Sequence, residues 1–293
     1  MIRTIDTPSA APASNGRHWA AFKVVELVVS GALFALIVVA ALLGEFLRTH
    51  DPTASDLAAR FLPMGSRGHL LGTDHLGRDM WSQLITGLQW SIACALTANV
   101  INLAIGTGLG LLAAERPGWT RAIVRQVADL FQSFPFLVVA IVVVVVIGHG
   151  FLPLVLTLGL LSWPIFMRVA YAEASSIYAR DYVKAARIAG AGRFAIMSGH
   201  VLPGLRASLL VVFALHFATL LIAESGLSFL GIGAPLGVPT WGNMLAESRQ
   251  YVLMFPRLLL VPAGAIIVAV ITANLLGDGL AAVARRRGRG IDV

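Results

Sequence analysis

The sequence predicts an all-α membrane protein with about six transmembrane helices. Hydrophobic residues make up 57% of its 293 residues and charged residues only 13%, against about 25% in average soluble domains. The mean hydropathy is +0.82. Because so few charges cannot cover a water-exposed surface, lipid must surround much of the chain. The positions of long apolar segments and of the basic residues support the same class.

Six segments are long enough to cross a membrane as helices, which takes about 20 apolar residues. They lie at 24–44, 91–114, 130–148, 151–170, 207–231 and 257–280. The third contains five consecutive valines, Val142–Val146, which in water would favour a strand. A single strand in lipid would leave its backbone polar groups unpaired, so a helix is predicted here too.

The basic residues predict the orientation. Six spans place both termini on one side, and 16 of the 22 Lys and Arg residues then share that side, leaving 6 on the other. Cytoplasmic loops carry the excess of Lys and Arg, so both termini are predicted to be cytoplasmic. The net charge of +7 therefore needs no nucleic-acid partner.

Four regions follow from this topology. They are a disordered cytoplasmic tail (1–22), a first transmembrane helix with a long periplasmic loop (23–90), a transmembrane core (91–282) and a basic cytoplasmic tail (283–293). The short segment Gly148–Gly150 predicts a tight turn between the third and fourth spans.

The cytoplasmic loop at 171–206 is more than a polar linker. Gly190 and Gly192 interrupt it and predict two short helices with a break between them. Ala185, Ala186 and Gly190 form a patch of small residues, which lets another backbone approach closely. An amphipathic loop that binds anionic lipid explains the pattern equally well.

The outer stretch at 69–87 contains His69, Asp74, His75 and Asp79. Such residues can bind a metal, but turn and cap chemistry explains them better, with Asp79 at the start of a helix.

Polar residues inside the predicted spans are candidates for a translocation path, because they are costly in lipid and usually face a cavity or a partner. The candidates are Glu224, Ser228, Asn99, Asn102 and Asn274. A structural hydrogen bond at a helix interface is the alternative for Glu224. The pair Gly106 and Gly110 fits close helix packing.

Three stretches resemble a known family. Residues 181–204 are similar to the Glu-Ala-Ala motif of ABC importer permeases, although Lys184 replaces the motif's glutamate and His200 its isoleucine. The stretch at 69–87 resembles the H-x-L-G-T-D-x-x-G-R-D-x-x-S signature of dipeptide, oligopeptide and nickel permeases. The segments at 223–233 and 238–245 resemble two further signatures of that branch, specifically of its second permease subunit.

The resemblance implies a type I importer fold in the bacterial inner membrane. It implies a coupling loop that docks on a separate ATPase and drives alternating access. The coupling residues would be Lys184, Ala185, Ala186, Arg187, Gly190, Leu202 and Pro203. The implied partners are a homologous second permease, two ATP-binding subunits that hold ATP and Mg²⁺, and a periplasmic solute-binding protein. The implied cargo is a di- or oligopeptide, with nickel, glutathione or another small peptide-like solute as alternatives; no metal or other cofactor is expected on this chain.

The sequence lacks the motifs of two enzyme classes. The sequence has neither G-x-x-x-x-G-K-[ST] nor H-E-x-x-H, so neither a P-loop nor a zinc-protease site is predicted. An intramembrane hydrolase using Ser225 and a histidine such as His216 lacks a G-x-S-x-G context. An ATP-independent secondary transporter is a second alternative, which ATP dependence of uptake would distinguish.

Overall fold

The computed structural model describes residues 15–66, 68–235 and 237–289. These residues form a helical bundle and contain no strand, only two isolated bridges. The helices are α1 (Asn15–Leu42), α2 (Gly44–Leu47), α3 (Met80–Glu115), α4 (Trp119–Gln132), α5 (Phe136–Ile147), α6 (Phe151–Leu161), α7 (Trp163–Tyr178), α8 (Asp181–Ile188), α9 (Arg193–Ile196), α10 (Leu202–Phe229), α11 (Trp241–Ser248) and α12 (Arg257–Arg289).

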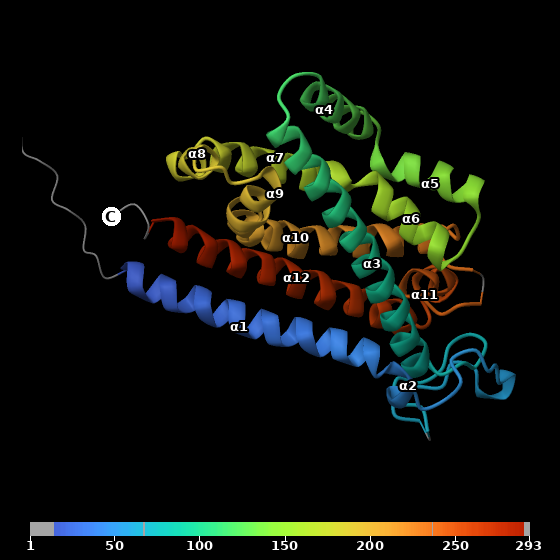
Figure 1. Ribbon diagram of the computed structural model, residues 1–293. Coiled ribbons are helices and arrows are strands. Elements are labelled where there is room, and N and C mark those ends of the chain that lie inside the picture. The colour runs from blue at the N-terminus through green and yellow to red at the C-terminus, as the bar shows by residue number, and fades with distance from the viewer. Residues whose placement is uncertain (1–14, 67, 236, 290–293) are drawn as a thin grey trace, which may run out of the picture.

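Five helical segments among the described residues are long and apolar enough to cross a membrane. They are Lys23–Leu42, Met80–Glu115, Phe151–Tyr178, Arg193–Phe229 and Arg257–Ala284. Helices α1, α12 and α10 run side by side and α3 crosses them obliquely, with α8 and α9 at one end of the bundle and the long loop between α2 and α3 at the other (Figure 1). Five of the six predicted spans are therefore confirmed.

The third predicted span, 130–148, is wrong as a continuous helix. Instead α4 and α5 meet at an angle of 87°, and the pair counts as a sixth span only if both are taken together. Pro135 separates them; proline lacks an N–H donor and restricts the residue before it. At about 1.5 Å per residue, α5 covers about 18 Å, which is too short for a membrane core.

The predicted region boundaries also need correction. Helix α1 already begins at Asn15, within the predicted 1–22 tail, and α12 continues to Arg289, within the predicted 283–293 tail. Helix α3 begins at Met80, inside the predicted periplasmic loop. The remaining tail residues, 1–14 and 290–293, lie outside the described residues.

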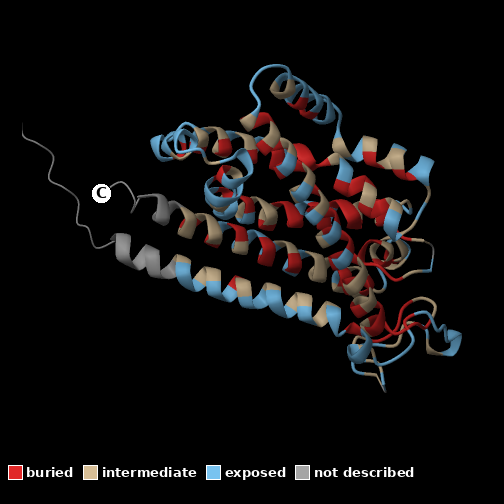
Figure 2. Ribbon diagram, in the orientation of Figure 1, coloured by how far each residue is buried: buried red, intermediate tan, exposed pale blue. Residues whose placement is uncertain are grey.

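Glycines let α3 and α7 pack closely at the centre of the bundle. A Cβ atom on Gly106 would lie 2.4 Å from the Trp163 carbonyl oxygen, and one on Gly110 would lie 2.7 Å from Ala170 Cβ. The predicted close packing at this glycine pair is confirmed. Buried residues concentrate on α3, α7 and α10, whereas α1 packs on α12 and leaves much of its surface exposed (Figure 2). Lipid is the natural solvent for that apolar surface.

Candidate functional site: the helical loop between α7 and α10

The loop between α7 and α10 is two short helices with a break, as predicted, although it is shorter than the predicted 171–206. Helix α8 begins at Asp181 and ends at Ile188, where the chain turns through Gly190 with φ of +88°. Glycine suits this conformation because it has no Cβ. Helix α9 follows and joins α10 through one π-helical turn, Met197–Val201. The loop is thus continuous with a long membrane helix.

The inner face of this loop is anchored in the bundle. Val183 of α8, Ile196 of α9 and Val201 are at most 1% exposed, and they pack in one cluster with Ile177 of α7 and Leu205 of α10. Packing on two long helices fixes the position of the loop. A force applied to α8 would therefore be transmitted to α7 and α10.

The outer face of the loop carries large apolar side chains that are exposed. Ile188 is 88% exposed, Phe194 75% and Tyr182 48%. Charged residues surround them: Lys184 pairs with Asp181 at 3.0 Å, and Arg193 lies 3.7 Å from Glu115. Exposed apolar residues within a charged rim are typical of a protein or membrane interaction site. The sequence prediction missed these three residues, because an isolated Ile or Phe in a loop has no distinctive spacing.

The predicted coupling residues lie on α8, at the turn that follows it and at the start of α10. Exposed are Lys184, Ala185, Arg187, Gly190 and Leu202, and half-buried are Ala186 and Pro203. A Cβ on Gly190 would meet nothing within 4 Å, so this position is open to a partner. Their role in coupling stays a prediction.

The predicted path residues divide into two groups. Glu224, Ser228, Asn99 and Asn102 are fully buried, whereas Asn274 is exposed on α12. Glu224 accepts hydrogen bonds from Ser228 Oγ at 3.0 Å and Ser225 Oγ at 3.3 Å. The Asn102 side-chain amide donates to the Leu158 carbonyl at 3.2 Å. Several of these groups are therefore partnered inside the bundle, which fits the structural alternative for Glu224.

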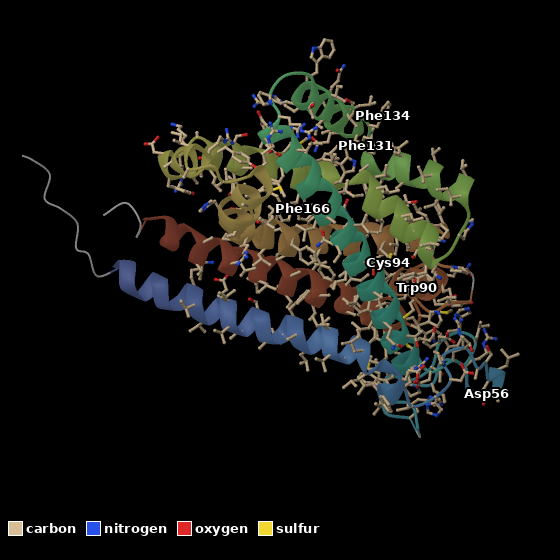
Figure 3. All side chains as sticks on the ribbon, in the orientation of Figure 1. Asp56, Trp90, Cys94, Phe131, Phe134 and Phe166 are labelled. Atoms are coloured by element: carbon tan, nitrogen blue, oxygen red, sulfur yellow. The ribbon has the colours of Figure 1, made fainter. Side chains whose placement is uncertain are left out.

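A second polar pair borders a cavity. His216 Nδ1 and Asn99 Oδ1 lie 2.9 Å apart. His216 also lines a cavity of about 320 Å³ at the bend between α4 and α5, together with Phe131 and Phe134, which Figure 3 labels at that bend. Ser225 and His216, the pair weighed as a hydrolase, engage Glu224 and Asn99 respectively. Their separate partners give no support to a nucleophile and base.

In the loop between α2 and α3, the predicted turn and cap chemistry is present. Asp79 is the N-cap of α3 and accepts from Ser82 N at 2.8 Å. Asp74 accepts from the backbone N–H groups of Leu76 and Arg78. Both aspartates therefore act as backbone caps.

Arg78 ties this loop to α11. Its buried guanidinium donates to Asp74 at 2.6 Å and also to Glu247 of α11. Burial opposes the charged form, but the charges of Asp74 and Glu247 outweigh burial and raise the pKa of Arg78. A guanidinium fork can bind two carboxylates at once in a way that an ammonium cannot.

We expect Arg78→Lys to lower the free energy of unfolding by about 2 kcal/mol, because one charge-assisted hydrogen bond is lost. Arg249→Lys is the matched control: Arg249 is exposed and donates to the Ala246 carbonyl, so a change below about 0.5 kcal/mol is expected. Denaturant unfolding in detergent measures both. Equal effects of the two substitutions would show that the Arg78 bridge contributes nothing specific.

The fold defines a multi-pass helical membrane protein, and exposed apolar side chains lie on α8 and α9 at one end of it. Comparison with known proteins identifies its family. The family model described as binding-protein-dependent transport system inner membrane component matches residues 106–290. The chain belongs to this family, whose members are the permeases of ABC importers, transport components rather than enzymes.

Two curated relatives are named as transport system permease proteins. A glutathione transport system permease protein, GsiD of Pectobacterium atrosepticum, is 34% identical over 89% of this chain and 87% of its own length. A di/tripeptide transport system permease protein, DppC of Pseudomonas aeruginosa, is 34% identical over 92% of this chain and 91% of its own.

A solved structure shares the fold. The MetNI methionine ABC transporter in an inward-facing conformation has a chain that matches with a TM-score of 0.56 and 19% identity, covering 70% of this chain and 95% of that one. The fold is that of the type I ABC importer permeases. The chain is an importer permease of the peptide and glutathione type in a multi-pass inner membrane setting.

Proposed function

We propose that this chain is one of two permease subunits of an ATP-driven importer that carries small peptides across the inner membrane by alternating access. The observation that carries this proposal is the α8–α9 surface, which holds apolar side chains in the open while its inner face is fixed to α7 and α10. A partner that grips this surface can move two membrane helices together, which is how a two-state pore is switched.

The partners follow from the same surface and from the family. Two ATP-binding subunits would hold ATP and Mg²⁺ and dock on α8–α9 and its counterpart in a homologous second permease. A solute-binding protein would deliver the cargo at the opposite end. With α8–α9 facing the cytoplasm, where most Lys and Arg lie, the termini are cytoplasmic as well.

The cargo is a di- or tripeptide, and the tripeptide thiol glutathione is the second candidate because relatives carry each name. Both are small and carry ammonium, carboxylate and amide groups, so one pore suits either. The buried polar groups Asn99, His216 and Glu224 are candidates for lining it.

Reconstitution tests the proposal. Proteoliposomes containing this permease, its second permease and both ATPases are supplied with solute-binding protein and labelled dipeptide or glutathione. We expect uptake only with ATP, and only when the ATPases are present. Uptake that persists without the ATPases, driven by an ion gradient, would identify a secondary transporter and overturn the proposal.

A further inference from the structure

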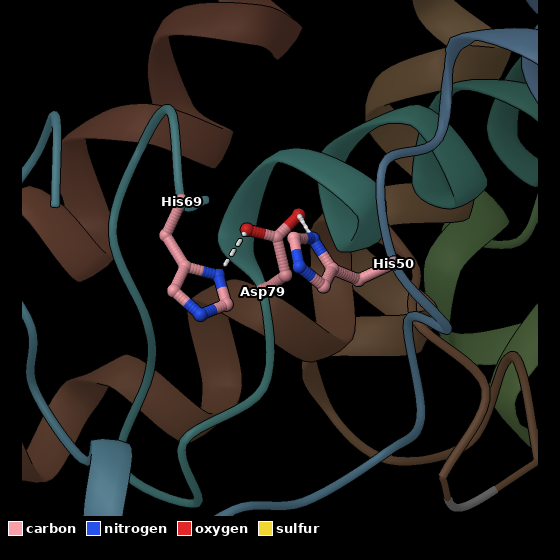
Figure 4. Close-up of side chains that lie close together, drawn as sticks. All are labelled: His50, His69 and Asp79. Atoms are coloured by element: carbon pink, nitrogen blue, oxygen red, sulfur yellow. Dashed lines mark hydrogen bonds and ion pairs between the residues drawn. The ribbon is translucent and has the colours of Figure 1, made fainter. Parts of the chain in front are cut away.

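Three metal-ligating side chains meet in the loop between α2 and α3 (Figure 4). His50 follows α2, His69 lies in the middle of the loop, and Asp79 begins α3. His69 Nδ1 lies 2.9 Å from one oxygen of Asp79, and His50 Nδ1 lies 3.9 Å from the other. One atom from each side chain lies within 4.8 Å of the other two. Two imidazoles thus present the same ring nitrogen to one carboxylate.

We propose that His50, His69 and Asp79 form a binding site for a divalent transition-metal ion of the Zn²⁺ class. Imidazole nitrogen and carboxylate oxygen are ligands that Zn²⁺ takes in proteins, with bonds of about 2.0–2.2 Å. Tetrahedral coordination at those lengths separates ligand atoms by about 3.3 Å. The observed separations of 2.9 Å and 3.9 Å lie on either side of that value. Small side-chain shifts would therefore accommodate the ion.

Surrounding hydrogen bonds hold the ligands in place. The backbone N–H groups of Thr49 and His50 both donate to Ser82 Oγ, at 3.2 Å and 3.0 Å. The Ser82 N–H in turn donates to Asp79 at 2.8 Å. The two imidazole rings stack with centroids 4.6 Å apart. Such second contacts orient ligands before an ion arrives.

Charge and access also suit an ion. The Asp79 side chain is 1% exposed. Its two carboxylate oxygens point in different directions, one toward each imidazole. The His50 side chain is 41% exposed, so an ion can enter from its side and keep water as a fourth ligand.

This ligand set differs from the candidate metal ligands noted in the stretch at 69–87. That set grouped His69 and Asp79 with Asp74 and His75. Asp74, His75 and Glu247 do lie together, but the Arg78 guanidinium already occupies both carboxylates and its positive charge opposes a cation. His50, which lies outside that stretch of sequence, supplies the missing third ligand.

The test is a zinc titration of the purified full chain in detergent, with any affinity tag removed and bound metal stripped by EDTA. Competition with a chromogenic zinc chelator near neutral pH measures the affinity. We expect one Zn²⁺ per chain. His50→Ala and His69→Ala should each weaken binding by at least about tenfold, whereas His75→Ala, the matched control, should leave it unchanged. His50→Cys should restore binding, because thiolate is also a zinc ligand.

Circular dichroism and thermal melting without metal check that each variant folds. A melting temperature that rises with zinc in the wild-type chain but not in His50→Ala would support the site. Stoichiometric binding that survives His50→Ala, or that His75→Ala removes instead, would overturn the proposal. Absence of any zinc binding to the folded wild-type chain would overturn it as well, and would leave the transport proposal unaffected.

Discussion

Replacing Ile188 by aspartate is expected to abolish ATP-driven uptake while leaving the permease folded in the membrane. Ile188 is 88% exposed on α8, so its replacement disturbs no packing in the isolated chain. Burying an isoleucine side chain in an interface stabilises it by about 1.5–3 kcal/mol, and a buried unpaired carboxylate adds a desolvation cost. A loss of about 3 kcal/mol weakens binding by more than about a hundredfold.

Co-purification of the ATPase subunits with the permease measures this loss, and ATP-dependent uptake by proteoliposomes measures its consequence. Leu253→Asp is the matched control. Leu253 is 97% exposed, but it lies between α11 and α12 at the opposite end of the bundle (Figure 1). We expect that variant to retain its ATPases. Normal co-purification by Ile188→Asp would show that α8 is not the docking surface.

A bulky residue at Gly106 is expected to have the largest effect on stability. The new side chain would meet the Trp163 carbonyl at 2.4 Å, Phe166 Cβ at 2.6 Å and the Met167 nitrogen at 2.9 Å. Two of these are backbone atoms, so α7 must move away from α3. Overpacking of a close-packed core costs about 1–3 kcal/mol. We expect Gly106→Leu to reach or exceed the upper value.

Gly108→Leu is the matched control on the same helix. Gly108 is exposed, and a Cβ there would meet nothing within 4 Å. Leucine has a higher helix propensity than glycine by about 0.5–1 kcal/mol, so this variant should be as stable as the wild type or slightly more so. Unfolding in mixed micelles compares the two. Equal free energies of unfolding for the two leucine variants would contradict the close packing of α3 on α7.

Several features could be predicted from sequence because they depend on short-range chemistry. Long apolar segments mark five spans, since solvation by lipid needs only length and composition. The break at Gly190 and the cap at Asp79 follow from properties of single residues. The Gly106 and Gly110 spacing places both glycines on one helix face, so their packing role was also predictable.

Other features depended on contacts that are distant in sequence. The segment at 130–148 is apolar enough for a span, yet the chain bends by 87° between α4 and α5, where Pro135 precedes α5. Apolar composition does not reveal whether a helix continues straight or bends. Glu224 and Asn99 were both predicted as polar residues of the translocation path. In the structure they form hydrogen bonds with different partners, Ser228 and His216.

The sequence by itself determined that lipid is the solvent, where five of the spans lie, and which family the motifs resemble. Only the tertiary structure decided which residues stand exposed on the α8–α9 surface and that His50 meets His69 and Asp79. The physical reason is the distance along the chain over which each property is set. Transfer into lipid is a sum over local residues, whereas a contact surface or a ligand set requires side chains that only packing brings together.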